Sequence, residues 1–140
     1  MGVEMDAFWE ELEKIAYVSL ATSKDDIVTV RPVAAVRNGE RILVRSNQPS
    51  RKIAQIAANA NVALSFGYFY LQGRADLLGS CQSEENEANR DTYRKKFPEA
   101  FGKKDAYLEE DDVFISILPT RINQWIFKEE TPTELAELLL

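Results

Sequence analysis

The stretch that decides the fold runs from residue 27 to residue 58 and reads IVTVRPVAAVRNGERILVRSNQPSRKIAQIAA. Ile27–Val36 and Arg41–Ser46 are rich in Val and Ile, which is typical of strands. Asn38-Gly39 lies between them and predicts a hairpin, because both residues tolerate a positive φ. Two antiparallel strands with a tight turn are therefore predicted at the centre of the fold.

Similar patterns continue on both sides of this hairpin. Apolar residues at three- and four-residue spacing predict an amphipathic helix over residues 4–15. Further helices are expected over Lys52–Ala58 and from Ser83 to Phe97, and a short C-terminal helix from Thr133 to Leu140. Gly73 marks a bulge or a close backbone approach, and Pro119-Thr120 predicts a turn. Further strands are predicted at Tyr17–Ala21, Val62–Phe66, Phe69–Leu78, Val113–Leu118 and Arg121–Phe127. Such a series predicts a mainly β chain with flanking helices, built as a small antiparallel barrel of six to seven strands.

Size and charge narrow the class of protein. A chain of 140 residues predicts one domain, spanning residues 1–140. Its 17 basic and 23 acidic residues give a net charge of −6, so neither nucleic acid nor an anionic membrane is an expected partner. Cys81 is the single cysteine and forms no intrachain disulfide, which fits a reducing compartment. With neither a signal peptide nor a membrane-spanning stretch recognised, we expect a cytoplasmic protein.

The absence of histidine excludes several kinds of site. The 140 residues contain none, so Ser-His-Asp triads, Cys-His pairs and histidine-ligated zinc are ruled out. Neither a P-loop nor a G-x-G-x-x-G pattern occurs among the six glycines. If the protein is an enzyme, a bound organic cofactor is expected to supply the chemistry, with no metal site.

The first candidate site is the start of the helix predicted over Lys52–Ala58. Residues 31–52 contain six basic side chains against one acid. The last two, Arg51 and Lys52, follow Ser50, which suits the N-cap. Cations near the positive end of a helix dipole are unfavourable, and an anion bound there would offset that cost. A phosphate monoester would accept hydrogen bonds from these three side chains and from backbone N–H groups. The alternative is a solvated helix start with two surface cations.

The second candidate lies within the strand, at Val30-Arg31-Pro32-Val33-Ala34. Side chains alternate along a strand, so Arg31 and Val33 share one face and Pro32 lies on the other. Proline has no N–H to donate, which predicts an edge or an opening in the ladder. A planar ligand could lie there, with Arg31 reaching its charged end; the alternative is an ordinary edge strand.

The third candidate is Trp125 near the end of the chain. On the strand predicted there, it shares a face with Arg121 and Asn123. An aromatic side chain among polar ones suits an interface or a cleft. The alternative is a Trp that covers the end of the barrel.

Together these stretches resemble the pyridoxamine 5'-phosphate oxidase-like FMN-binding split-barrel family, in its short, general-stress-protein-like branch. The resemblance covers residues 5–128. Its most specific part is Ser50 to Ile56, Arg31-Pro32-Val33 is less specific, and Gly73-Arg74-Ala75 is weak. It implies a split β-barrel that forms a homodimer, with one FMN in each of two clefts at the subunit interface.

The resemblance also implies roles for individual positions. Ser50–Lys52 would hold the FMN phosphate, and Arg31–Val33 would line the isoalloxazine and the ribityl chain. Ser46 and Asn47 would add polar contacts, and Trp125 of the other subunit would close the cleft. The cofactor-binding residues carried over by position are Arg31, Pro32, Val33, Ser46, Asn47, Ser50, Arg51, Lys52 and Trp125.

Two departures from the family pattern bear on function. The turn at Lys24-Asp25-Asp26 lacks the usual glycine, and no arginine-bearing segment follows Trp125 to hold a vitamin B6 substrate. We therefore expect an oxidoreductase that transfers electrons or hydride between FMN and another small molecule, with no catalytic side chain identified. The alternatives are a non-enzymatic flavin-binding sensor or stress protein, and a relative that binds deazaflavin F420.

Overall fold

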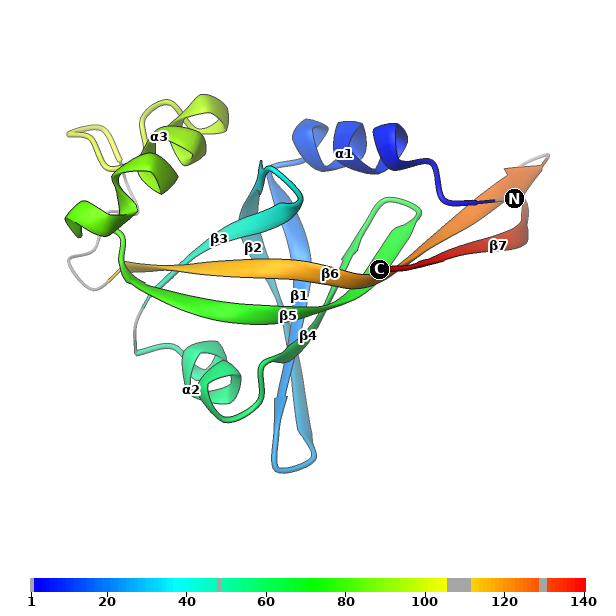
Figure 1. The fold of residues 1–140 in the computed structure, drawn as a ribbon, viewed down its shortest axis with the longest axis horizontal. Coiled ribbons are helices and arrows are strands. Elements are labelled where there is room, and N and C mark those ends of the chain that lie inside the picture. Colours follow the sequence, from blue (N-terminus) through cyan, green and yellow to red (C-terminus); the bar gives the residue numbers. More distant parts are fainter. Residues whose placement is uncertain (1, 48, 106–111, 129–130) are drawn as a thin grey trace.

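The computed structural model describes residues 2–47, 49–105, 112–128 and 131–140 (Figure 1). Its helices are α1 (Met5–Lys14), α2 (Arg51–Ala58) and α3 (Glu87–Lys96), with a short 3-10 turn, η1 (Glu84–Asn86), before α3. Its strands are β1 (Tyr17–Lys24), β2 (Ile27–Asn38), β3 (Arg41–Asn47), β4 (Asn61–Phe66), β5 (Phe69–Ser80), β6 (Asp112–Lys128) and β7 (Thr131–Leu139). None of these helices is long and apolar enough to span a membrane.

All the strands belong to one antiparallel sheet in the order β3-β2-β1-β4-β5-β6-β7. A further pairing of β3 with β6 closes the first six strands into a barrel, and β7 extends β6 beyond it. In Figure 1, α1 and α3 lie above β5 and β6, α2 lies below these two strands and beside the β1–β2 hairpin, and the β6–β7 hairpin projects to one side. The predicted mainly β barrel with flanking helices is confirmed.

Alternation along β3 explains why the chain has two apolar cores. Ile42 and Val44 face the barrel interior, where the predicted apolar stripe of α1, Phe8 and Leu12, also packs. Leu43 points the other way, into a second cluster beneath α3. A strand buried on both faces leaves little room for polar residues, so the polar side chains of β3 gather at its end.

The predicted C-terminal helix is wrong. Residues from Thr131 to Leu139 form β7, which pairs with β6 from Lys128 back to Arg121. The local sequence is rich in Glu, Leu and Ala, which favour helix. The second half of β6 nevertheless offers a free edge, and pairing there satisfies the backbone groups of both strands. Tertiary pairing therefore overrides local propensity.

The predicted turn at Pro119-Thr120 is also wrong, because β6 runs through it without a break. Pro119 faces Gly73 in the ladder and Arg121 faces Gln72, so Thr120 is an extra residue in a bulge. Its hydroxyl donates to the Gln72 carbonyl at 3.2 Å. A bulge tolerates the missing N–H of proline without ending the strand.

Replacing Gly73 with alanine is expected to lower the free energy of unfolding by about 1–3 kcal/mol, because the new methyl group overpacks the bulge. Its Cβ would lie 2.8 Å from the Leu118 carbonyl oxygen and 2.9 Å from Ile117 Cγ2. Urea denaturation measures the loss. Gly102→Ala is the control, because its Cβ would meet the nearest atom at 3.4 Å. Equal losses in the two variants would contradict the close-approach explanation.

Candidate functional site

The candidate site is a split between β2 and β3. The two strands pair from Asn38–Arg41 to Ala35–Val44 and then separate. Beyond this point β2 continues along β1, while β3 continues along β6 as far as Asn47. The split leaves one edge of each strand without a ladder partner among the described pairings.

Backbone groups of β2 face this split. Lys24 and Ile27 flank the two-residue turn of the β1–β2 hairpin and so form a hydrogen-bonded pair. Hydrogen-bonded and non-hydrogen-bonded pairs alternate along an antiparallel ladder. Counting along the register, Pro32 and Ala34 fall at non-hydrogen-bonded positions, where their backbone groups point away from β1. The missing donor of Pro32 is thus harmless, and the predicted opening in the ladder is confirmed.

A cavity of about 390 Å³ occupies the split. Its volume lies within the usual range for small-molecule sites. Five of the nine predicted cofactor-binding residues line it: Pro32, Val33, Ser46, Asn47 and Lys52. The other five lining residues were not among the predicted cofactor-binding residues, although Ala34 lies in the second candidate stretch: they are Tyr17, Ala34, Arg45, Tyr93 and Asp112.

Three cations gather near the start of α2: Lys52, which lines the cavity, and Arg31 and Arg51, which do not. Burial, followed by the charge of Arg31, lowers the pKa of Lys52. Burial, followed by the charge of Arg51, lowers the pKa of Arg31. Within the described part of the chain, no carboxylate forms an ion pair with any of the three. Like charges held together without a counterion make a site that an anion would stabilise.

Arg31 is held in place by a polar cluster behind the cavity. Its guanidinium donates to the Thr22 hydroxyl at 2.8 Å, to Gln55 Oε1 at 3.3 Å and to the Thr29 hydroxyl. Gln55 is 4% exposed, and its Oε1 also accepts from Thr22 and Thr29 at 2.5 and 2.7 Å. This cluster fixes the Arg31 charge near Lys52 and Arg51, although Arg31 does not line the cavity.

Ser50 occupies the N-cap position of α2, as predicted, but its hydroxyl makes no capping bond. It lies 3.2 Å from the hydroxyl of Ser46 instead. Arg51, the first residue of α2, is exposed. Two hydroxyls, the start of a helix and the ammonium of Lys52 are therefore grouped at one end of the split.

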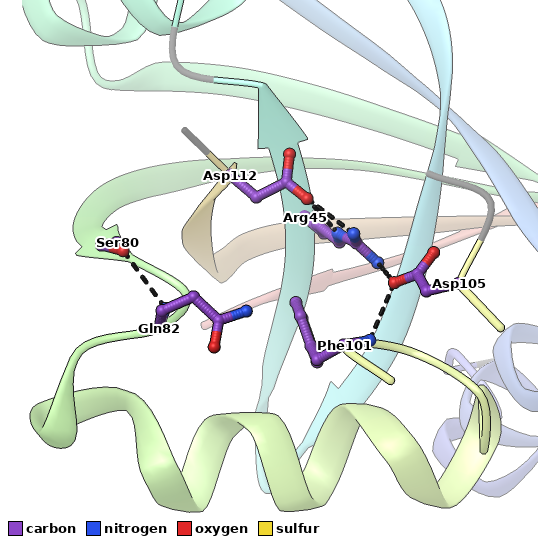
Figure 2. A network of polar contacts seen from close by, with 6 residues as sticks. All are labelled: Arg45, Ser80, Gln82, Phe101, Asp105 and Asp112. Atoms are coloured by element: carbon purple, nitrogen blue, oxygen red, sulfur yellow. Dashed lines mark hydrogen bonds and ion pairs between the residues drawn. The ribbon is translucent and has the colours of Figure 1, made fainter. Parts of the chain in front are cut away.

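Arg45 forms a buried ionic network at the opposite side of the cavity (Figure 2). Its guanidinium lies 2.6 Å from Asp112 and 2.8 Å from Asp105, with 10% of its side chain exposed and 5% of each aspartate's. Burial alone would lower the pKa of Arg45, but hydrogen bonds and charges from both aspartates outweigh it and raise the pKa. Asp105 also accepts from the Phe101 N–H at 2.8 Å, and the Phe101 ring lies 4.5 Å from the guanidinium. The network ties residues 101–105 to the end of β3.

Trp125 and Cys81 lie outside the cavity. The Trp125 side chain is 41% exposed on the second half of β6, and the backbone N–H of Trp125 donates to the Tyr68 carbonyl at 2.9 Å. Its predicted contact is with the cleft of another subunit and stays a prediction.

Cys81 is fully buried, and burial, followed by the charge of Asp112, raises the pKa of its thiol to about 12. Such a thiol is a poor nucleophile.

Comparison with known proteins identifies relatives of this arrangement. The sequence model of the family described as Pyridoxamine 5'-phosphate oxidase matches residues 4–126. No curated protein matches the chain significantly.

Solved structures share the fold at low sequence identity. General stress protein 26 from Bacillus anthracis str. Sterne is 18% identical, with a TM-score of 0.60, over 94% of this chain and 98% of that one. A FAD-binding protein from Mesorhizobium loti is 20% identical, with a TM-score of 0.65, over 86% and 92% of the two chains. An F420 reductase is 23% identical, with a TM-score of 0.60, over 81% and 93%.

Proposed function

The chain belongs to the pyridoxamine 5'-phosphate oxidase family, and from this premise we propose that it binds a flavin, FMN, in the split between β2 and β3. One observation carries the proposal. Lys52, Arg31 and Arg51 gather without a carboxylate partner among the described residues, next to a strand edge with free backbone groups. A phosphorylated, planar cofactor requires a cationic end and a polar edge of this kind.

The residues at the α2 end fit a phosphate. Lys52 would contribute a direct charge, and Arg51 a second one from the surface. The hydroxyls of Ser46 and Ser50 donate or accept as needed, because neither is used to cap α2. Arg31 would act through its charge, since its guanidinium is already bonded within the Gln55 cluster.

The edge of β2 fits the isoalloxazine ring system of the flavin. Among the described pairings, the Pro32 carbonyl and the Ala34 N–H and carbonyl have no ladder partner on this side, and Val33 also lines the cavity. An isoalloxazine has both donors and acceptors on its polar edge and an apolar remainder. Bound there, the flavin would accept and release hydride or single electrons, and the protein would orient it and exclude water. On this basis we propose an oxidoreductase that acts on a small molecule in the reducing cytoplasm.

We also propose that the protein works as a homodimer. Ile27, Val28 and Val30 are 60–70% exposed on β2, beside the split. Val28 and Val30 share one face of β2, since side chains alternate along a strand, and exposed apolar side chains gathered on one face mark interaction surfaces. A second copy would cover them, and its Trp125 would close the cleft as the family pattern implies. Sedimentation equilibrium tests this: a monomer in both the FMN-loaded and the flavin-free protein would refute it.

The flavin proposal is tested with the purified protein. We expect a flavin absorption spectrum, and FMN as the compound that heating releases. Isothermal titration of the flavin-free protein should show FMN binding about 100-fold or more tightly than riboflavin, because riboflavin lacks the phosphate. Equal affinities would overturn the phosphate site. A colourless protein that binds neither would overturn flavin binding, and F420 would then be titrated as the alternative ligand.

A further inference from the structure

A second and larger cavity lies beside the split, beneath α3. Its volume is about 570 Å³. It shares four lining residues with the first cavity: Tyr17, Ala34, Arg45 and Tyr93. A molecule bound in it would therefore lie next to whatever occupies the edge of β2.

Aromatic side chains form its walls. The Tyr93 and Phe97 rings lie 5.0 Å apart, centroid to centroid, because positions four residues apart share a face of α3 and its end. Tyr17 is 57% exposed on β1 and lines the same cavity. Aromatic residues of β1 and of the α3 end in one lining favour a flat, apolar ligand, which would gain aromatic contacts as well as apolar burial.

Two lysines add positive charge to this apolar space. Lys96 donates to the carbonyls of Leu12 and Ala35, each at 2.7 Å, so one of its three donors is left for a ligand. Burial lowers the pKa of Lys96, which Glu13 partly offsets. Lys104 is exposed at the rim. Glu99 also lines the cavity, and Asp105 is already engaged by Arg45.

We propose that this cavity binds the reaction partner of the flavin, and that this partner is a flat aromatic molecule bearing a carboxylate or a similar anionic group. The aromatic walls would hold the ring, and Lys104 and the third donor of Lys96 would hold the anion. This role as a reaction partner rests on the proposed flavin site. The two cavities share the wall formed by Tyr17, Ala34, Arg45 and Tyr93, so a ligand in the second cavity would be next to a flavin bound in the first.

The test uses 2-naphthoate and its neutral counterpart 2-naphthamide as probes. Each is titrated calorimetrically into the flavin-free and the FMN-saturated protein, and the FMN absorption bands are recorded. Lys104→Glu is the test variant. Lys103→Glu is the matched control, because it makes the same charge change one residue away and does not line this cavity.

We expect 2-naphthoate to bind both forms of the protein, to bind more tightly than 2-naphthamide, and to shift the FMN bands. Lys104→Glu should weaken 2-naphthoate about tenfold and leave 2-naphthamide unchanged, because an attraction becomes a repulsion. Lys103→Glu should change neither. Absence of binding, competition between 2-naphthoate and FMN, or equal effects of the two variants would overturn the inference. Lys104-dependent binding to a protein that takes up no flavin would instead locate the failure in the proposed function.

Discussion

Replacing Arg45 with methionine is expected to lower the free energy of unfolding by about 3–5 kcal/mol. The substitution would remove the Arg45 guanidinium from Asp105 and Asp112, whose side chains are each 5% exposed. Removing one partner of a buried ion pair costs far more than the pair contributes, because the remaining charge stays out of water. A loss of this size is a large share of the stability of an ordinary domain.

Arg41→Met is the matched control for this prediction. Arg41 lies on the same strand and pairs with Asp76 at 3.2 Å, but the two side chains are 39% and 65% exposed. Solvent screens such a pair, so its loss should cost about 0–1 kcal/mol. Urea denaturation of the three proteins gives both differences. Similar values for Arg45→Met and Arg41→Met would mean that the buried network contributes no more than a surface pair.

Lys52→Met is expected to weaken FMN about 10- to 100-fold and to leave riboflavin nearly unchanged, because one charge-assisted contact to the phosphate is lost. The free energy of unfolding of the flavin-free protein should rise or stay unchanged. The pKa of Lys52 is lowered by burial and by the charge of Arg31, so its charged form is disfavoured in the folded chain. Removing that charge should therefore not destabilise the fold.

Lys24→Met is the control for the binding measurement, since Lys24 is exposed at the end of β1 and the net charge changes equally. Titration calorimetry with FMN and with riboflavin gives the two affinities for each protein. Unchanged FMN affinity in Lys52→Met would refute the phosphate role of this lysine. Equal weakening of FMN and riboflavin would place Lys52 at the ring and not at the phosphate.

Short sequence patterns predicted the features that individual residues signal, such as the start of a helix or a break in a ladder. The start of α2 lies at Ser50 and Arg51 because Pro49 ends the strand and a polar residue precedes an apolar helical stripe. The opening at Pro32 follows from a missing N–H, and the bulge at Gly73 from a position where a side chain does not fit. The first two depend on one residue and its neighbours in sequence, whereas at Gly73 the glycine itself is the local signal and the close contact is with Ile117 and Leu118 on β6.

The remaining features depend on contacts between distant segments. Arg45 meets Asp105 and Asp112 across 60 and 67 residues, so no spacing pattern could indicate the network. Tyr93 reaches the cavity only because α3 packs against β2, with Tyr93 in the same cluster as Val36, Leu43 and Phe114. The C-terminal segment has helix-forming residues and becomes β7 because an edge of β6 is available to it. Pairing of this kind can be recognised only once the barrel is assembled.

The pairing of β6 with β3 has a consequence for the newly made chain. Synthesis proceeds from the N-terminus, at about 5–20 residues per second. Until residues 112–117 leave the ribosome, β3 has no second partner, the ring of strands stays open and β2 and β3 are not drawn apart. Until then, the sheet of β1 to β5 has unpaired edges. Unpaired edges favour aggregation, so this is the stage at which a chaperone would be most useful. Uptake of the proposed cofactor between β2 and β3 would then follow the synthesis of residues 112–117.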